Sequence, residues 1–258
     1  MKADRQAPIG VFDSGVGGLT VVREIMRNLP DERIVYFGDT ARVPYGSKSK
    51  NTVIRYSRQI VHFLETQQVK AIVIACNTAT SVAASTLRQQ YPSIPIIGIE
   101  PALKPAVLWK EHDKVAVMAT PATLALPKFQ ELMKVYSKES DIYPVPCPGL
   151  ADYVEKGIFD GEEITEFLKG LLAPSLEKHV DAIVLGCTHY PFVEKVIQRI
   201  AGPDVKIFNG AHGTALELQR RLRIAELLTP SIEKGTVEFY SSSTNPETIK
   251  LCHQLFEA

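Results

Sequence analysis

Short apolar runs separated by longer amphipathic stretches make up almost the whole chain. Each run is rich in β-branched residues and is bounded by polar or turn-forming positions, which is typical of buried strands. The predicted strands are Ile9–Phe12, Arg33–Phe37, Ala71–Ala75, Ile94–Ile97, Lys114–Met118, Ile142–Val145, Ala182–Leu185, Val205–Phe208 and Val237–Tyr240.

The stretches between the strands carry apolar residues at helical spacing. The clearest are Thr52–Gln67, Ala79–Gln90, Glu162–His179 and Ala215–Leu227. Alternation of strands and helices indicates parallel sheets covered by helices on both faces. The predicted fold class is therefore α/β with mainly parallel sheets.

Two segments far apart in the chain share one frame. Residues 69–78 read VKAIVIACNT and residues 180–189 read VDAIVLGCTH. In each, a predicted strand ends in a cysteine that is followed by residues favouring a helix cap or turn. The repeat predicts two related α/β domains that face one another across a cleft.

Turn-rich segments predict the domain boundaries. The first lies at residues 98–101, where Pro101 can open a helix, and the second at 209–213. We therefore expect one lobe from residues 1–98 plus 209–258, carrying Cys76, and a second from residues 99–208, carrying Cys187.

Composition excludes several function classes. The chain has 258 residues, of which 45% are hydrophobic and 22% charged, as in ordinary globular proteins. A formal net charge of zero removes the global attraction to nucleic acid or anionic membranes. The basic cluster Arg220, Arg221 and Arg223 is interpreted as a solvated helix face. No segment approaches the roughly 20 apolar residues that span a membrane.

The cysteines indicate a reducing compartment. The four cysteines form neither a CxxC pair nor a disulfide framework, and the short polar N-terminus predicts no signal peptide, so we expect a cytoplasmic protein. Cys147 and Cys252 are interpreted as small buried residues. Zinc binding by Cys76, Cys187 and His189 is disfavoured because the residues are scattered, and no metal is predicted.

Chemistry-bearing residues gather at predicted strand ends, where parallel sheets bind ligands. Two thiols at equivalent strand ends suggest acid/base work on both faces of one substrate. Asp13 and Ser14 follow the first strand in a glycine-rich turn that lacks the spacing of a dinucleotide or phosphate loop. The turn either presents a carboxylate and a hydroxyl to a ligand or is purely structural.

Polar residues after other strands leave two interpretations open. The loop at residues 38–46 either closes over a small polar ligand or is a structural turn in which Tyr45 packs on its neighbour. Asn77–Thr78 and Thr188–His189 suit a substrate carboxylate at a helix start, or are helix caps. His189 can also exchange a proton with a nearby thiol. Glu155 is a candidate helper carboxylate, although an isolated helical Glu usually lies at the surface.

These motifs together closely resemble the glutamate racemases of the aspartate/glutamate racemase family. The motifs are FDSGVGG (12–18), DTARVPYG (39–46), ACNTA (75–79) and LGCTHYP (185–191). The resemblance covers nearly the whole chain. It implies two pseudo-symmetric α/β domains with the active site at their interface. It also implies cofactor-independent racemisation of glutamate for bacterial peptidoglycan, and a homodimer.

The resemblance assigns roles residue by residue. It makes Cys76 and Cys187 the catalytic thiols and Glu155 an auxiliary glutamate. Because a free thiol has a pKa of about 8.5 and neighbours must tune it, Asp13 is suited to assist on the Cys76 side and His189 with Glu155 on the Cys187 side. The implied substrate-binding pairs are Asp13 with Ser14, Tyr45 with Gly46, Asn77 with Thr78, and Thr188 with His189. The segment NGAHGT at 209–214 departs from the Asp/Ser-rich version expected of the family.

Racemisation explains why two thiols are needed. The Cα proton leaves one face and another returns to the opposite face, and two fixed groups avoid swinging one base around the carbon. Without pyridoxal phosphate, donors around the developing enediolate and exclusion of water must lower the barrier. An aspartate or hydantoin racemase would use two thiols in the same way, and is an alternative within the same class of enzyme. Two other classes of protein are disfavoured by the pair of cysteines. A Cys–His hydrolase needs only one nucleophilic cysteine, and a non-catalytic amino-acid-binding protein needs no cysteine.

Overall fold

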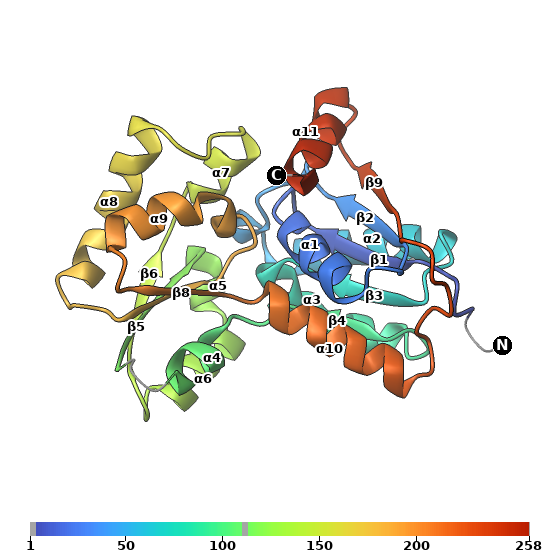
Figure 1. Cartoon of the computed structure of the whole chain (residues 1–258), viewed down its shortest axis with the longest axis horizontal. Coiled ribbons are helices and arrows are strands. Elements are labelled where there is room, and N and C mark those ends of the chain that lie inside the picture. Colours follow the sequence, from blue (N-terminus) through green and yellow to red (C-terminus); the bar gives the residue numbers. More distant parts are fainter. Residues whose placement is uncertain (1–3, 110–112, 258) are drawn as a thin grey trace. The chain divides into compact units, whose positions relative to one another are not determined.

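A computed structural model describes residues 4–109 and 113–257 (Figure 1). The chain divides into two compact units: unit 1 is Met1–Ile99 with Ala211–Ala258, and unit 2 is Glu100–Gly210. Residues 1–3 and 258 of the predicted first lobe, and 110–112 of the predicted second, lie outside the described residues. Each unit holds one sheet.

Unit 1 is built on a five-stranded sheet of order β4-β3-β1-β2-β9, in which every pairing is parallel. Its strands are β1 (Ile9–Asp13), β2 (Ile34–Gly38), β3 (Ala71–Ile74), β4 (Ile96–Gly98) and β9 (Val237–Ser241). Its helices are α1 (Leu19–Asn28), η1 (Tyr45–Ser47), α2 (Lys50–Thr66), α3 (Asn77–Gln90), α10 (Ala211–Ile224) and α11 (Pro246–Glu257).

Unit 2 is built on a four-stranded parallel sheet of order β6-β5-β7-β8. Its strands are β5 (Lys114–Ala119), β6 (Asp141–Pro146), β7 (Ala182–Leu185) and β8 (Lys206–Asn209). Its helices are α4 (Leu103–Leu108), α5 (Pro121–Ala125), α6 (Pro127–Tyr136), α7 (Leu150–Glu155), α8 (Glu162–Leu176), η2 (Tyr190–Val193) and α9 (Glu194–Ala201). The parallel α/β fold predicted from the sequence is confirmed.

The two sheets have the same internal strand order. Read from one edge, unit 1 runs β4-β3-β1-β2 and unit 2 runs β8-β7-β5-β6, so fourth, third, first and second strands correspond. In both, the chain passes from the first strand to one neighbour and then crosses to the other side for the third strand. Because such crossovers are right-handed, the helix after the first strand covers one face of the sheet, and the helices after the second and third strands cover the other. The resulting topological switch point lies between the first and third strands.

The central strands form because their residues suit burial on both faces. Every residue of β1, β3 and β7 is buried, which accounts for their continuous apolar runs in place of polar–apolar alternation. In unit 1, α1 packs against α10 and α11, whereas α2 packs against α3. The core therefore lies on both faces of the sheet and holds the carboxyl ends of its strands in fixed positions.

Several predicted element boundaries were wrong. The helix expected to open at Pro101 begins at Leu103, since Ala102 occupies the N-cap with non-helical torsions. The helix expected to run to His179 ends at Leu176, and His179 itself has a positive φ of 54°. The turn expected at 209–213 is partly helical, because α10 begins at Ala211 and includes Gly213.

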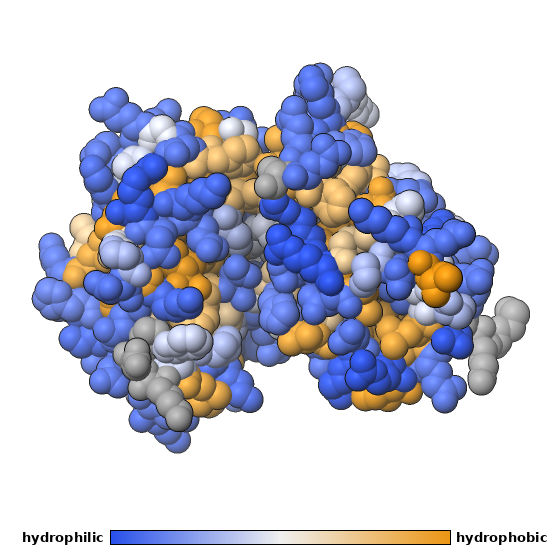
Figure 2. Space-filling model, viewed as in Figure 1, coloured by the Kyte–Doolittle hydropathy of each residue, from blue (hydrophilic) through white to orange (hydrophobic). Residues whose placement is uncertain are grey.

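The face in Figure 2 is mainly hydrophilic, with several groups of hydrophobic residues scattered over it. Arg220, Arg221 and Arg223 are exposed, as predicted. Within residues 4–109 and 113–257, no helix has both the length and the apolarity needed to cross a membrane. The large hydrophobic side chains that stand exposed are Leu108, Trp109, Val135, Leu216, Ile224 and Ile232.

Candidate active site

Asp13, Ser14 and Cys76 lie at the switch point of the unit 1 sheet. Asp13 is the last residue of β1, and Cys76 follows the neighbouring β3 by two positions. The Cys76 sulfur lies 3.7 Å from the Ser14 hydroxyl oxygen, and all three residues are buried. Sixty-two positions of chain separate these two side chains, and the parallel pairing of β1 with β3 brings them together.

The Asp13 carboxylate holds the turn between β1 and α1. Its Oδ2 accepts a hydrogen bond of 2.9 Å from the backbone N–H of Gly18. A Cβ on Gly18 would lie only 2.6 Å from the Asp13 Cβ, so a side chain there would displace the carboxylate. Gly18 is therefore needed for the close packing of this turn, which positions a buried carboxylate near the Cys76 strand end.

Cys76 is the N-cap residue of α3. Its sulfur accepts a hydrogen bond of 3.4 Å from the backbone N–H of Ala79. Donors at a helix N-terminus and the helix dipole favour negative charge, so this position stabilises a thiolate.

Asn77 and Thr78 open α3 beside Cys76, and both are buried. The Asn77 Oδ1 atom is inaccessible to solvent and accepts no hydrogen bond from any described residue. An unpaired buried polar atom costs about 1–3 kcal/mol. A ligand that donates a hydrogen bond to Oδ1 would offset that cost.

Tyr45 and Gly46 lie in the short helix η1, which packs against α3. Gly46 is half-buried and Tyr45 is buried. The Tyr45 hydroxyl donates to Oδ2 of Asp39, a residue that the sequence did not single out as part of the site. Burial, then the Asp39 charge and this hydrogen bond, and then the Cys76 charge raise the pKa of Tyr45, so the phenol stays protonated.

Unit 2 presents Cys187 at the corresponding switch point. The residue follows β7 by two positions, as Cys76 follows β3. Gly186 lets the chain pass close to neighbouring β5, because a Cβ there would lie 2.8 Å from the Met118 carbonyl oxygen. Cys187 is partly exposed, and Thr188 beside it is buried.

Glu155, His189 and Cys187 form a chain of contacts. The Cys187 sulfur lies 3.6 Å from His189 Nδ1, and His189 Nε2 lies 2.6 Å from Glu155 Oε1. Burial opposes charge on the imidazole, but hydrogen bonds and charges of Cys187 and Glu155 outweigh it, so the pKa of His189 is raised well above its ordinary value. The imidazole can therefore carry a proton that is shared with the thiol.

Cys147 and Tyr190 are buried near Cys187, and neither was predicted to belong to the site. The Tyr190 hydroxyl donates to the Cys147 carbonyl oxygen at 3.4 Å. Burial and then the Cys187 charge raise the pKa of Cys147 to about 12, so this thiol stays neutral. The predicted burial of Cys147 and Cys252 is confirmed.

The structure thus gathers the predicted residues into two groups, one in each unit. Unit 1 holds Asp13, Ser14, Tyr45, Gly46, Cys76, Asn77 and Thr78, and unit 2 holds Glu155, Cys187, Thr188 and His189. Asp39 was missed as a site residue, although it follows a strand as directly as Asp13 does. Within residues 4–109 and 113–257, no three His, Cys, Asp or Glu side chains are grouped to hold a metal ion.

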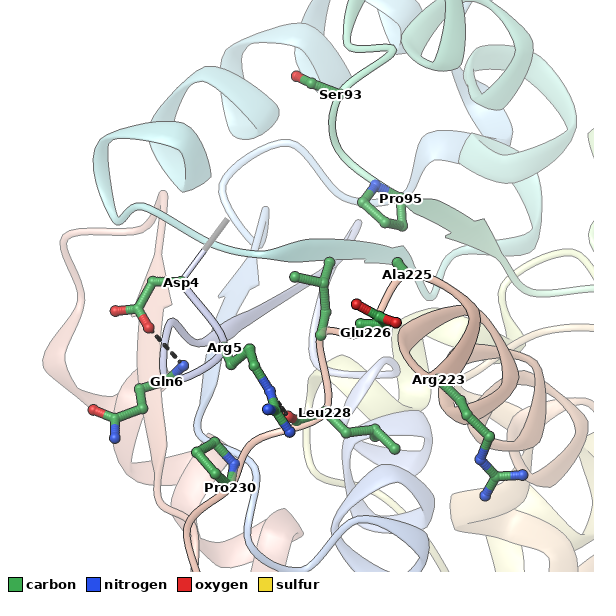
Figure 3. Close-up of a pocket in the computed structure, with 11 residues that line it drawn as sticks. Asp4, Arg5, Gln6, Ser93, Pro95, Arg223, Ala225, Glu226, Leu228 and Pro230 are labelled. Atoms are coloured by element: carbon green, nitrogen blue, oxygen red, sulfur yellow. Dashed lines mark hydrogen bonds between the residues drawn. The ribbon is translucent and has the colours of Figure 1, made fainter. Parts of the chain in front are cut away.

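A cavity of about 960 Å³ in unit 1 contains none of these residues. It lies toward the amino ends of the strands, between residues 4–6, 93–95 and 223–230 (Figure 3). Two hydrogen bonds of 2.9 Å order its wall, from the Arg5 Nε to the Leu228 carbonyl oxygen and from the Gln6 N–H to Asp4. The chemistry-bearing residues gather at the opposite ends of the strands.

Both units are parallel α/β folds of one strand order, and each carries a cysteine two residues past its third strand. Residues 9–216 match the Asp/Glu/Hydantoin racemase family, and the chain belongs to this family. A glutamate racemase from Clostridium novyi is 49% identical over 249 residues, which are 96% of each chain. The resemblance recognised in the sequence motifs is confirmed, and with it the prediction of a racemase, an isomerase.

Two solved structures show the same similarity. A glutamate racemase isoform from Bacillus anthracis has a TM-score of 0.88 and 34% identity, with 98% of this chain and 95% of that chain covered. Glutamate racemase from Francisella tularensis in complex with D-glutamate has a TM-score of 0.85 and 33% identity, with the same coverage.

Proposed function

We propose that this chain interconverts L- and D-glutamate by moving a proton at Cα between two cysteines, without a cofactor. The observation that carries the proposal is the equivalence of Cys76 and Cys187, each two residues past the third strand of its sheet. Membership of the racemase family and the 49% identity to a glutamate racemase support glutamate as the substrate.

In the proposed mechanism, one cysteine is a thiolate and the other a thiol when substrate binds. The thiolate removes the Cα proton, and the thiol delivers its own proton to the opposite face, so each turnover exchanges the two protonation states. This mechanism requires both thiols to reach one Cα, from opposite faces. The direction of reaction decides which cysteine begins as the base.

On the Cys76 side, the proposed thiolate is supported by neutral donors. The Ala79 N–H and the N-terminus of α3 favour the charge, and the Ser14 hydroxyl lies within reach of the sulfur. Asp13, buried at the neighbouring strand end, is proposed to assist the exchange of the proton at Cys76.

On the Cys187 side, the proposed base is paired with an imidazolium. His189 holds a proton readily because Glu155 lies against its far nitrogen. His189, held by Glu155, can pass that proton to Cys187 when Cys187 acts as an acid, and keep it when Cys187 acts as a thiolate.

Substrate binding is proposed to use the pairs predicted from the sequence: Asp13 with Ser14, Tyr45 with Gly46, Asn77 with Thr78, and Thr188 with His189. Asn77 and Thr78 lie at the N-terminus of α3, where backbone N–H groups suit a substrate carboxylate. The buried hydroxyls of Ser14, Thr78 and Thr188 suit the carboxylate on which charge develops.

The proposed product, D-glutamate, would supply bacterial peptidoglycan synthesis in the cytoplasm, where all four cysteines remain free thiols. A homodimer is part of the same proposal and is tested by sedimentation equilibrium.

The function is tested with purified protein and no added cofactor. Circular dichroism should show loss of optical activity from both L- and D-glutamate, and the reaction in D₂O should place deuterium at Cα. Racemisation of aspartate but not glutamate would overturn the proposed substrate. Dependence on added pyridoxal phosphate would overturn the cofactor-independent mechanism.

A further inference from the structure

Asp39 lies at the carboxyl end of β2, where its side chain joins two segments of the site. The residue is fully buried, and its backbone N–H donates to the Asp13 carbonyl oxygen at 3.0 Å. Oδ1 accepts a hydrogen bond of 2.7 Å from Arg42 Nε, and Oδ2 accepts one from the Tyr45 hydroxyl. With both oxygens occupied and no exposure, the carboxylate is placed to hold the protein and not to contact substrate.

Arg42 is held by several contacts within unit 1, although its side chain is 25% exposed. Besides Asp39, it donates from Nη1 to Gln59 Oε1 at 2.5 Å, and its guanidinium carbon lies 4.1 Å from the ring centroid of Tyr56. The Tyr56 ring in turn packs 5.9 Å from that of Tyr45. Arg42 is therefore a clamp on the loop and not a counterion for a substrate carboxylate.

We propose that Asp39 is a positioning residue, which fixes the loop from Arg42 to Gly46 so that Tyr45 and Gly46 meet the substrate beside Cys76. The inference rests on the proposed function, because it assigns Tyr45 and Gly46 to substrate binding. The Asp39 side chain acts through hydrogen bonds to two loop side chains. Its backbone N–H holds the end of β2 against the end of β1 through the hydrogen bond to the Asp13 carbonyl oxygen.

The reason for a carboxylate at this position follows from its two donors. An ionised carboxylate only accepts hydrogen bonds, so it satisfies both a guanidinium and a phenol at once. An amide of the same shape has one acceptor and one donor. In Asp39→Asn the NH2 group cannot accept, so the hydrogen bond that the Tyr45 hydroxyl donates would be lost or reversed, and both contacts would lose the carboxylate charge that strengthens them. The loop should therefore loosen while the fold survives.

The test compares Asp39→Asn with Glu32→Gln, which also neutralises a buried carboxylate of unit 1. Glu32 pairs with Lys70 and touches none of the loop residues. Asp39→Asn should raise KM for both glutamate enantiomers about tenfold, the size of one lost hydrogen bond, with kcat changed less than twofold and its pH profile unmoved. Glu32→Gln should lower stability and leave KM unchanged.

Two further readouts separate positioning from a merely structural role. Amide hydrogen exchange of residues 40–48 should quicken in substrate-free Asp39→Asn and not in Glu32→Gln. Adding Asp39→Asn to Tyr45→Phe should raise KM little further, because both changes break the same contact.

Unchanged KM with unchanged exchange would overturn the proposal. A loss of kcat in one direction only would also overturn it, since Asp39 would then act on proton transfer at Cys76. Failure of the wild-type protein to racemise glutamate would refute the proposed function, whereas the exchange measurement would still test whether Asp39 holds the loop.

Discussion

Glu155 Oε1 lies 2.6 Å from the Nε2 atom of His189, a residue 34 positions later in the chain. Glu155 ends α7, and His189 immediately precedes η2, so the contact depends on packing between these two elements. The opposite nitrogen of the same ring faces Cys187. One imidazole therefore joins a carboxylate to a thiol, which makes the protonation of His189 depend on both.

Stability should depend on pH through this contact. Because the folded pKa of His189 is raised, its contribution is fully present below the unfolded value of about 6.5 and is lost as pH rises through the folded value. Glu155→Gln should lower the free energy of unfolding by about 1.5–3 kcal/mol at pH 6, the range for hydrogen bonds to charged groups.

The measurement is urea unfolding of both proteins at pH 6 and in the alkaline range. The difference in the free energy of unfolding between the wild-type protein and Glu155→Gln should become smaller as pH rises. The control is Glu166→Gln, which breaks an exposed pair with Lys169 in the same unit. A gap that is constant with pH would show that Glu155 does not stabilise the protonated ring.

Replacing either Cys76 or Cys187 should abolish racemisation. In the two-base mechanism, Cys76→Ala and Cys187→Ala each remove the group that serves one face of Cα. Each variant should retain one-sided chemistry, seen as Cα deuterium exchange or elimination from a poor substrate analogue with one enantiomer only. Cys252→Ala, at a buried cysteine in α11, is the matched control and should keep its activity. Full racemase activity in Cys76→Ala or Cys187→Ala would refute the mechanism.

The helper residues should act on one direction each. Asp13→Asn should slow racemisation more in the direction in which Cys76 is the base than in the opposite direction. His189→Asn should slow racemisation more in the direction in which Cys187 is the base. Asn at position 13 can still accept the Gly18 N–H, so the turn should persist. Initial rates from L- and D-glutamate measure the effect. Equal losses in both directions would make the two residues substrate binders only.

The buried pair of Lys70 and Glu32 should stabilise unit 1 without affecting catalysis. Lys70 Nζ lies 2.5 Å from Glu32 and donates to the Arg5 carbonyl oxygen, and Glu32 Oε1 accepts from the Thr229 N–H. Glu32→Gln leaves a buried ammonium without its counterion and should cost about 3–5 kcal/mol in urea unfolding. The combined change Glu32→Gln with Lys70→Met should recover part of that loss, and failure to recover any would show that the charge pairing is not the cause.

The sequence alone determined the strands, the fold class and the family, because each depends on local information. A continuous apolar run such as Ala71–Ile74 or Ala182–Leu185 can only be a buried strand or helix segment, and its short length and β-branched residues favour the strand. The residue that follows such a strand lies at the ligand-binding edge of a parallel sheet, so Asp13, Cys76 and Cys187 were recognisable before any contact was known.

Tertiary structure decided which side chains share a contact and which protonation state they favour. The sequence named Glu155 and His189 from a motif, but their separation of 2.6 Å arises from helix packing that no local pattern encodes. Asp39 was passed over because a polar residue after a strand is common, and only the fold shows its carboxylate occupied by Arg42 and Tyr45. Hydrogen bonds between distant side chains depend on ångström-scale packing, and a raised pKa depends in addition on burial, so both follow from the folded chain and not from the order of its residues.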